Sequence, residues 1–183
     1  MKRIIRAGIC EVFTICKFVW KKIFNGSKFK FGIINICSPF SEVEISKGGR
    51  IEIGEKFRMR GNCHLRVRKD GNVIIGKNVT WNYGCMVVSH KKIKIGDNVQ
   101  FGPNVLIYDH DHDFRVQGGL NNKDFIVAPV EIGNNVWIGA NSVILRGTKI
   151  GNNCIVGAGT VLKGEYADNS VIVQKRETAV TNI

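Results

Sequence analysis

A short run of acidic residues and histidines, Asp109, His110, Asp111, His112 and Asp113, is the part of the chain best suited to chemistry. A neutral imidazole can take up a proton near pH 7, and a neighbouring carboxylate can orient the ring and stabilise its cationic form. The run is therefore a candidate for proton-transfer chemistry, with a merely solvated loop as the alternative.

The residues that follow this run repeat with a period of six. Every sixth residue is a bulky aliphatic one, namely Ile132, Ile138, Ile144, Ile150, Val156 and Leu162. Two positions earlier stands a small or β-branched residue, namely Val130, Val136, Ser142, Thr148, Cys154 and Thr160. Because a period of six fits neither an amphipathic helix nor an ordinary strand, it predicts a solenoid of short strands. The corners between strands suit positive φ, which glycine and asparagine allow, at Gly133, Asn134, Asn135, Gly151, Asn152 and Asn153.

The period also extends upstream of the histidines, and its interruptions are informative. The phase changes around residues 66–72 and again around 89–92, and the period then stops between Ile107 and Val130. The gap predicts a loop over residues 108–129, and a loop of about twenty residues in a compact domain usually has a function. The histidines lie in this loop.

The composition is that of one globular domain with reduced thiols. The chain has 183 residues, of which 44% are hydrophobic, with 21 glycines and 3 prolines, which resembles neither disorder nor collagen. None of its 6 cysteines forms a C-x-x-C pair. This pattern favours packing cysteines in a cytosolic protein over a disulfide framework.

Positive charge is concentrated at the amino terminus. Residues 1–30 hold eight lysines or arginines against the single acid Glu11, within a chain of formal net charge +12. The chain carries no recognised nucleic-acid-binding motif, so we expect no nucleic-acid partner.

Residues 2–24 are predicted to form an amphipathic helix. Its apolar stripe consists of Ile5, Ile9, Val12, Cys16, Val19 and Ile23, flanked by Phe13 and Trp20. The uncharged runs are far shorter than the roughly 20 residues that span a bilayer, and no signal-peptide cleavage site is visible. Two interpretations stay open: peripheral contact with an anionic membrane, or a helix that caps the end of the solenoid.

Two segments carry a family resemblance, IGDNVQFGPNVLIYDHDHDF (Ile95–Phe114) and VEIGNNVWIGANSVILRGTKIGNNCIVGAGTVLKG (130–164). They resemble the hexapeptide-repeat acyltransferases, most closely the galactoside, maltose and polysaccharide O-acetyltransferase branch. The resemblance implies an all-β solenoid that is a left-handed parallel β-helix. The left hand comes from the resemblance alone, because the usual rule for crossovers would favour the right hand. The expected organisation is a helix and linker over 1–30, the β-helix over 31–172 and a tail over 173–183.

The resemblance also implies an activity. Such enzymes transfer an acetyl group from acetyl-CoA to a hydroxyl, without a required metal, in a homotrimer whose active sites lie between subunits. Their loop histidine acts as general base, and the matching position is His112, five residues beyond Ile107. His110 is its rival two residues away, and the orienting carboxylate is left open between Asp109, Asp111 and Asp113.

Other positions follow from the same resemblance. The acceptor would be bound by Asn82, and the cofactor by Trp137, the main chain of Gly139 and Ala140, Ala158 and Lys163. A main-chain N–H at Gly139 or Ala140 would meet the thioester oxygen as negative charge develops there. Three of these positions also have a structural alternative: a solenoid corner for Asn82, a subunit contact for Trp137, and a solvated surface lysine for Lys163.

The carboxyl terminus departs from the family pattern. Relatives often end with a G-x-P-A-[KR] segment whose basic residue approaches the CoA phosphates, whereas this chain reads VIVQKRETAVTNI. Lys175 and Arg176 are the candidates to replace that charge.

The expected function is therefore O-acetylation of a sugar hydroxyl, on a cell-surface polysaccharide or its lipid-linked precursor, in the cytoplasm and in peripheral contact with the inner membrane face. Three alternatives stay open: a xenobiotic O-acetyltransferase, a carbonic anhydrase with three histidines on a metal, and a non-catalytic solenoid.

Overall fold

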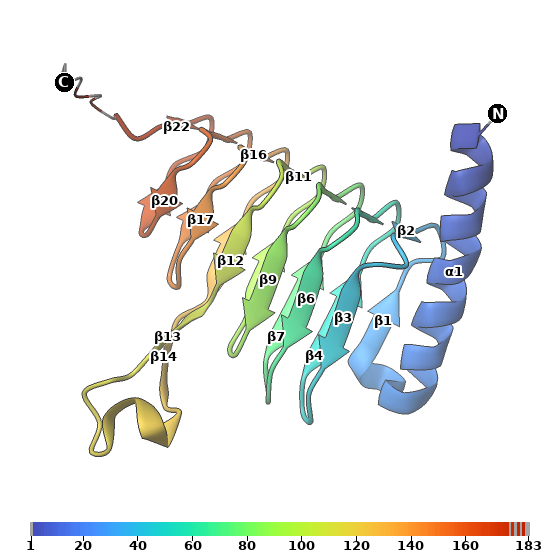
Figure 1. Cartoon of the computed structure of the whole chain (residues 1–183), viewed down its shortest axis with the longest axis horizontal. Helices are drawn as coiled ribbons and strands as arrows, with labels where there is room; N and C mark the ends of the chain where they lie inside the picture. Colours follow the sequence, from blue (N-terminus) through green and yellow to red (C-terminus); the bar gives the residue numbers. More distant parts are fainter. Residues whose placement is uncertain (1, 176, 178, 180, 182–183) are drawn as a thin grey trace.

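The structure, a computed structural model, is a β-solenoid with one helix lying across its amino-terminal end (Figure 1). It describes residues 2–175, 177, 179 and 181, and for residues 2–7 the backbone alone. Helix α1 (Lys2–Asn25) is followed by the short 3-10 helix η1 (Gly26–Lys28), after which the chain winds into the solenoid.

The solenoid has three sides, and each side is a parallel sheet, which we call A, B and C. The 7-stranded sheet A contains, in spatial order, β1 (Phe29–Phe31), β4 (Arg50–Ile53), β7 (Asn72–Ile75), β10 (Ile93–Ile95), β15 (Val130–Ile132), β18 (Lys149–Ile150) and β21 (Glu165–Tyr166). The 7-stranded sheet B contains β2 (Ile36–Cys37), β5 (Arg58–Met59), β8 (Thr80–Trp81), β11 (Gln100–Phe101), β16 (Trp137–Ile138), β19 (Ile155–Val156) and β22 (Val171–Ile172). The 6-stranded sheet C contains β3 (Glu42–Ile45), β6 (His64–Val67), β9 (Met86–Ser89), β12 (Leu106–Tyr108), β17 (Val143–Ile144) and β20 (Val161–Leu162).

The core is built by the residues that the six-residue period selects. Every member of the two repeat sets between Val130 and Leu162 is buried, and none exposes more than 3% of its surface. Strand register explains this, because Glu131 pairs with Lys149 and Trp137 with Ile155. Each coil there has 18 residues, so an inward position of one coil stacks on the inward position of the next. The predicted inward positions are thereby confirmed.

The first coil lies almost wholly within the predicted β-helix over 31–172, but the six-residue period does not mark it. Its strands β1, β2 and β3 place Phe29, Cys37 and Val43 in the same core as the later coils. The corresponding small positions hold buried Asn35 and Ser41, whose polarity hides the period. The Asn35 side chain is satisfied internally, since its Oδ1 accepts a hydrogen bond from the Phe57 N–H at 2.8 Å.

All departures from the period occur at one edge of the solenoid, where the chain passes from sheet C to sheet A. We call this the C–A edge. Extra residues lie there at 46–49, 68–71 and 90–92, each between a strand of sheet C and the next strand of sheet A. The segment 109–129 is the largest of these insertions, and it carries the histidines out of the wall of the solenoid (Figure 1).

The corners differ from the sequence prediction in one respect. Positive φ is found at Asn135 and Asn153, at 58° and 55°, but not at the other predicted corner residues. Gly133 is needed for a different reason: a Cβ there would lie 2.7 Å from the Gly151 carbonyl carbon of the next coil. Stacked backbone, rather than left-handed conformation, excludes a side chain at this position.

Helix α1 caps the first coil, but not through the apolar stripe that the sequence shows. Among its described side chains, the buried ones are Thr14 and Phe18, each 1% exposed. The Thr14 hydroxyl bridges the backbone of Cys37, accepting from its N–H at 2.7 Å and donating to its carbonyl at 3.2 Å. Phe18 packs edge-on against Phe29 and Phe31. The predicted stripe therefore faces away from the solenoid wherever its side chains are described.

Candidate active site

The histidine loop projects from the C–A edge as a small hairpin. Strand β13 (His110–His112) pairs antiparallel with β14 (Phe125–Val127), with His110 opposite Val127 and His112 opposite Phe125. A 3-10 helix, η2 (Gly119–Asn122), lies between the two strands. The hairpin therefore holds the histidine-bearing strand in a defined conformation, which a loop without internal pairing would not do.

Asp109 fixes the base of this hairpin. Its side chain is fully buried, and its carboxylate accepts hydrogen bonds from the Ser89 hydroxyl at 2.7 Å, the His90 N–H at 2.7 Å and the Lys91 N–H at 2.8 Å. Burial alone would raise the pKa of this carboxyl, but hydrogen bonds, among them contacts with His110 and the His90 N–H, outweigh burial and lower the pKa. Asp109 thus acts as an ionised anchor between two coils.

A cluster of aromatic rings covers this anchor. The ring centroids of His90 and His110 are 4.1 Å apart. Phe125, on strand β14 of the hairpin, has its ring centroid 4.1 Å from that of His90. The pKa of His90 is lowered to about 4, first by burial and then by the neighbouring His110. His90 is therefore neutral at physiological pH.

The lowered pKa of His90 predicts a pH-dependent stability. An unfolded histidine has a pKa of about 6.5, so below that pH the unfolded chain binds a proton that the folded chain refuses. We expect the urea midpoint of the parent protein to fall as the pH drops from about 6.5 to about 4, and His90→Gln to fall less steeply. Paired urea titrations at several pH values measure this difference. Equal slopes for parent and variant would contradict the assignment.

His112 lies further out and is exposed. Its ring packs against Phe125 at 4.7 Å, and among the described residues no carboxylate is hydrogen-bonded to it. His110, by contrast, exposes 12% of its side chain, and its Nδ1 lies 3.4 Å from Asp109 Oδ1. Within one chain the histidine with a carboxylate partner is thus His110, whereas the histidine that a substrate can reach is His112.

The other two predicted carboxylates have separate roles. Asp111 forms an ion pair with Arg146 at 2.5 Å between Oδ2 and Nε, which ties the hairpin to the C–A edge of the next coil. Asp113 accepts a hydrogen bond from the Arg115 N–H at 3.0 Å within the loop. Ser89, His90, Phe125 and Arg146 were not identified in the sequence, although the phase change near residues 89–92 marks the first two.

Four of the other predicted residues stack along a different edge, where the chain passes from sheet B to sheet C. On this B–C edge Asn82 follows β8, Gly139 and Ala140 follow β16, and Ala158 follows β19. The coils approach closely here, since a Cβ on Gly139 would lie 2.5 Å from the Ala158 nitrogen. The edge therefore exposes main chain rather than bulky side chains.

The main-chain donors of this edge can be told apart. The Gly139 N–H is occupied by the Val156 carbonyl at 2.8 Å, and the Ala140 carbonyl accepts from the Gly159 N–H at 2.7 Å. In the described part of the chain, the N–H groups of Ala140 and Ala158 have no hydrogen-bond partner. Of the two donors considered for the thioester oxygen, Ala140 is therefore the one that is free.

The remaining predicted residues are exposed. Trp137 points outward from sheet B with 56% of its surface exposed, beside Ile155 at 41%. Lys163 lies on the C–A edge after β20, and Lys175 is also exposed. Arg176 lies outside the described residues.

One chain consequently divides the predicted site between two edges. The histidine loop leaves the C–A edge of sheet C, while Asn82, Ala140 and Ala158 lie on its B–C edge. The intervening sheet keeps the two groups apart within one chain.

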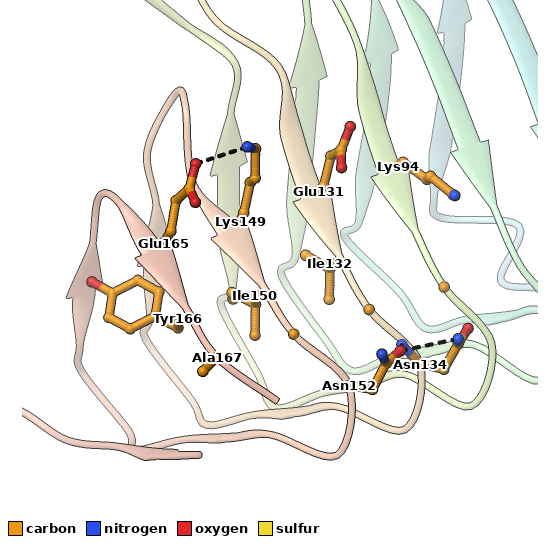
Figure 2. Close-up of a pocket in the computed structure, with 13 residues that line it drawn as sticks. Lys94, Glu131, Ile132, Asn134, Lys149, Ile150, Asn152, Glu165, Tyr166 and Ala167 are labelled. Atoms are coloured by element: carbon orange, nitrogen blue, oxygen red, sulfur yellow. Dashed lines mark hydrogen bonds and ion pairs between the residues drawn. The ribbon is translucent and has the colours of Figure 1, made fainter. Parts of the chain in front are cut away.

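A surface groove lies elsewhere, on sheet A. A groove of about 590 Å³ runs along the outer face of sheet A, and Figure 2 shows Lys94, Glu131, Lys149 and Glu165 alternating in sign across it. Lys149 and Glu165 form an ion pair at 2.7 Å. The groove contains none of the predicted site residues. The described residues also hold no group of three or more His, Cys, Asp or Glu side chains that could bind a metal ion.

Comparison with known proteins agrees with the fold and the repeat. The family model for the bacterial transferase hexapeptide (six repeats) matches residues 129–164. The chain is 33% identical over 146 residues to the galactoside O-acetyltransferase of Lactococcus lactis, covering 78% of this chain and 68% of that one. It is 38% identical over 153 residues to a putative acetyltransferase of Saccharomyces cerevisiae, covering 82% and 76%.

Two solved structures are similar as well. A maltose O-acetyltransferase from Clostridium difficile 630 is 31% identical with a TM-score of 0.55, over 79% of this chain and 65% of that one. A galactoside acetyltransferase solved in complex with coenzyme A is 27% identical with a TM-score of 0.51, over 73% and 61%.

A parallel β-solenoid of hexapeptide repeats with a histidine hairpin at one corner defines the left-handed β-helix class of acyltransferases, and the predicted fold is confirmed. This chain belongs to the hexapeptide-repeat acetyltransferase family, and it is an acetyl-CoA-dependent acyltransferase. In the described residues, no helix is long and apolar enough to cross a membrane.

Proposed function

We propose that the protein transfers an acetyl group from acetyl-CoA to a hydroxyl of a sugar in a cell-surface glycan or its lipid-linked precursor, with His112 as the general base. The observation that carries this proposal is an exposed His112 on a hairpin whose two strands are paired. The B–C edge of the same sheet offers free main-chain N–H donors. The sugar acceptor is supported by relatives named for galactoside and maltose.

The reaction needs one base and one oxyanion donor. His112 removes the hydroxyl proton as the sugar oxygen attacks the thioester carbonyl, and the Ala140 N–H stabilises the negative charge that develops on the carbonyl oxygen. The carbon–sulfur bond then breaks, and the proton held by His112 passes to the leaving sulfur. The products are the sugar acetate and free coenzyme A.

We infer that the working unit is a trimer with its sites between neighbouring subunits. The two halves of the site lie on different edges of one solenoid, so a C–A edge that meets the B–C edge of a neighbour would join them. In the later coils, exposed apolar residues flank the B–C edge, with Trp137 and Ile155 on sheet B and Val161 on sheet C. The outer face of sheet A instead alternates charges, which suits solvent.

The test is an acceptor screen with the full-length chain. Acetyl-CoA is incubated with free and lipid-linked oligosaccharides, and with aminoglycoside and other hydroxyl-bearing antibiotics, while thiol release and product mass are followed. We expect a glycan to gain one acetyl mass at a rate at least tenfold above hydrolysis, since oriented base catalysis contributes about 10²-fold or more. Acetylation of an antibiotic alone would overturn the glycan assignment. If none of the acceptors raises thiol release above the rate of hydrolysis, the proposed activity is overturned.

The cytoplasm is the proposed location. Acetyl-CoA is a cytoplasmic metabolite in this scheme, and all six cysteines are unpaired in the structure, which suits a reducing compartment. Peripheral contact with the inner membrane face, through residues 2–24, belongs to the same proposal.

A further inference from the structure

The outward side of α1 is apolar along all of its described side chains. Its residues Ile9, Val12, Val19, Trp20, Ile23 and Phe24 expose between 45% and 69% of their surface, and we call this set the end face. Trp20 and Phe24 contact each other, with ring centroids 4.7 Å apart. At 100° per residue these positions occupy the side opposite Thr14 and Phe18, which face the solenoid. The helix is therefore amphipathic in the unusual sense that its apolar side faces solvent.

Basic residues border this end face. Lys22 is exposed on the same helix and Lys28 in the following turn η1, while Lys17 is turned inward, where its Nζ donates to the Ser41 carbonyl at 2.5 Å. Residues 1–30 as a whole carry eight basic residues against one acid. A contiguous apolar surface with a basic border has the composition of an interfacial membrane helix.

We propose that the end face docks on a bilayer of anionic phospholipid and thereby presents the active site to lipid-linked glycans. The charge argues for this occupant over a second copy of the chain, because residues 1–30 carry eight basic residues against one acid, so two copies would bring segments of the same sign together. An anionic headgroup layer instead attracts the basic residues that lie near it, by about 1 kcal/mol per Lys or Arg near the surface.

The geometry fixes how the molecule stands on that surface. Figure 1 shows α1 lying across the end of the solenoid, with the strands stacked away from it along the long axis. A helix lying flat in the interface therefore sets the solenoid upright on the membrane. Side-by-side solenoids in the proposed trimer would place three end faces at one end, and three linked contacts bind much more tightly than one.

The upright orientation also places the histidine loop at a defined height. Three strand spacings separate β3 from β12 in sheet C, which is about 14 Å at roughly 4.8 Å each. With a helix diameter of about 10 Å beneath the first coil, the loop base stands roughly 25 Å above the outward side of α1. An interfacial helix sinks about 5–10 Å, and the headgroup layer is only about 5–8 Å deep.

The substrate class follows from this height and rests on the proposed acetyl transfer. The reactive histidine clears the headgroup layer by roughly 10 Å, so a hydroxyl on the lipid headgroup itself is out of reach. The acceptor is instead a sugar in the part of a lipid-linked glycan that projects from the membrane into the cytoplasm.

Vesicle binding tests the docking surface directly. The full chain is mixed with vesicles of phosphatidylglycerol and phosphatidylcholine, and the bound fraction is measured by flotation. We expect Trp20→Ser with Ile23→Ser to lower binding at least tenfold, since each removed side chain would bury most of its apolar area in the membrane. The matched control, Val171→Ser with Val173→Ser, removes equally exposed apolar residues at the opposite end of the solenoid and should bind like the parent. Equal losses in both pairs would overturn the proposal, as would an end-face pair that binds normally.

The tryptophans test the orientation. With bromine-labelled acyl chains in the vesicles, fluorescence quenching should come from Trp20 and not from Trp137, which lies on sheet B in a later coil. Trp20→Phe should therefore bind vesicles but lose the quenching, whereas Trp137→Phe should keep it. Quenching that persists in Trp20→Phe would overturn the upright orientation. Vesicle-dependent dissociation of a large oligomer would identify a second copy as the occupant instead.

These outcomes separate docking from catalysis. If docking is correct, the Trp20→Ser, Ile23→Ser variant acetylates free glycan at the parent rate but loses its preference for the lipid-linked form in anionic vesicles. Vesicle binding without any acetyl transfer would leave the docking surface standing and remove the proposed function.

Discussion

Replacement of His112 by alanine is expected to lower kcat for acetyl transfer by about 10²- to 10⁴-fold, the range that a positioned general base contributes. The KM for acetyl-CoA should change little, because the proposed role of His112 is to take the proton of the acceptor hydroxyl and not to hold the cofactor. Thiol release with a saturating glycan acceptor measures both constants. His112 is exposed and forms no hydrogen bond to a carboxylate in the described residues, so the variant should unfold at the parent's urea concentration.

Two further histidine variants decide whether the assignment is correct. His64→Ala removes a histidine that is paired with Glu42 on sheet C, two coils from the loop base, and should retain the parent activity. His110→Ala removes the ring that packs on His90. If His110→Ala abolishes turnover while His112→Ala stays near normal, the base is His110, held by Asp109, and the present assignment is wrong.

Asp109→Ala should destabilise the fold more than any other substitution in the loop. It removes the carboxylate that accepts from the buried Ser89 hydroxyl and from the partly buried N–H groups of His90 and Lys91. At about 1–3 kcal/mol for each buried unsatisfied group, partly offset by relaxation of the corner, we expect a loss of about 3–5 kcal/mol in the free energy of unfolding. Urea denaturation followed by circular dichroism measures it.

The pH dependence gives an independent check on Asp109. Its folded pKa is lowered, so the stability that it contributes is complete above the unfolded pKa of about 3.9 and is lost as the pH falls through the folded value. The Asp109→Ala variant should therefore lose less stability than the parent below about pH 4. Asp113→Ala, which removes a partly exposed acceptor in the same loop, should change stability by less than about 1 kcal/mol. A loss of the same size in both variants would contradict the anchor role.

The scaffold could be predicted because its physical cause is local and repeated. A buried position such as Ile138 or Ser142 recurs every six residues, so the period alone identifies the inward side of each strand. The repeat within the first coil was not identified, because Asn35 and Ser41 are buried polar residues whose hydrogen-bond partners are invisible in a sequence. The acyltransferase class came from the family resemblance, and the comparisons confirm it.

The site could be predicted only in part, because its contacts are not periodic. The loop and its histidines were located by the interruption at Ile107, but the anchor of Asp109 in the corner of Ser89 and His90 depends on how two coils stack. The ion pair of Asp111 with Arg146 spans 35 residues and leaves no mark in either segment. The catalytic and cofactor roles of the named residues stay predictions.

The direction of α1 shows the same limit from another side. Its periodicity identified two unlike sides, but the side that packs on the solenoid was decided by the fit of Thr14 and Phe18 to the first coil. Hydrophobic patterning alone would have placed the stripe of Val19 and Ile23 inward.

Because the solenoid is stacked in whole coils, the distance between α1 and the histidine hairpin can take only certain values. Adding one complete coil between β9 and β10 would move the histidine hairpin about 4.8 Å further from α1 and leave every inward side chain in its register. Adding a single residue within a strand would instead turn all later side chains of that strand to the wrong side. The distance between α1 and the hairpin can therefore change only by discrete steps, and it is counted by the number of coils before the hairpin.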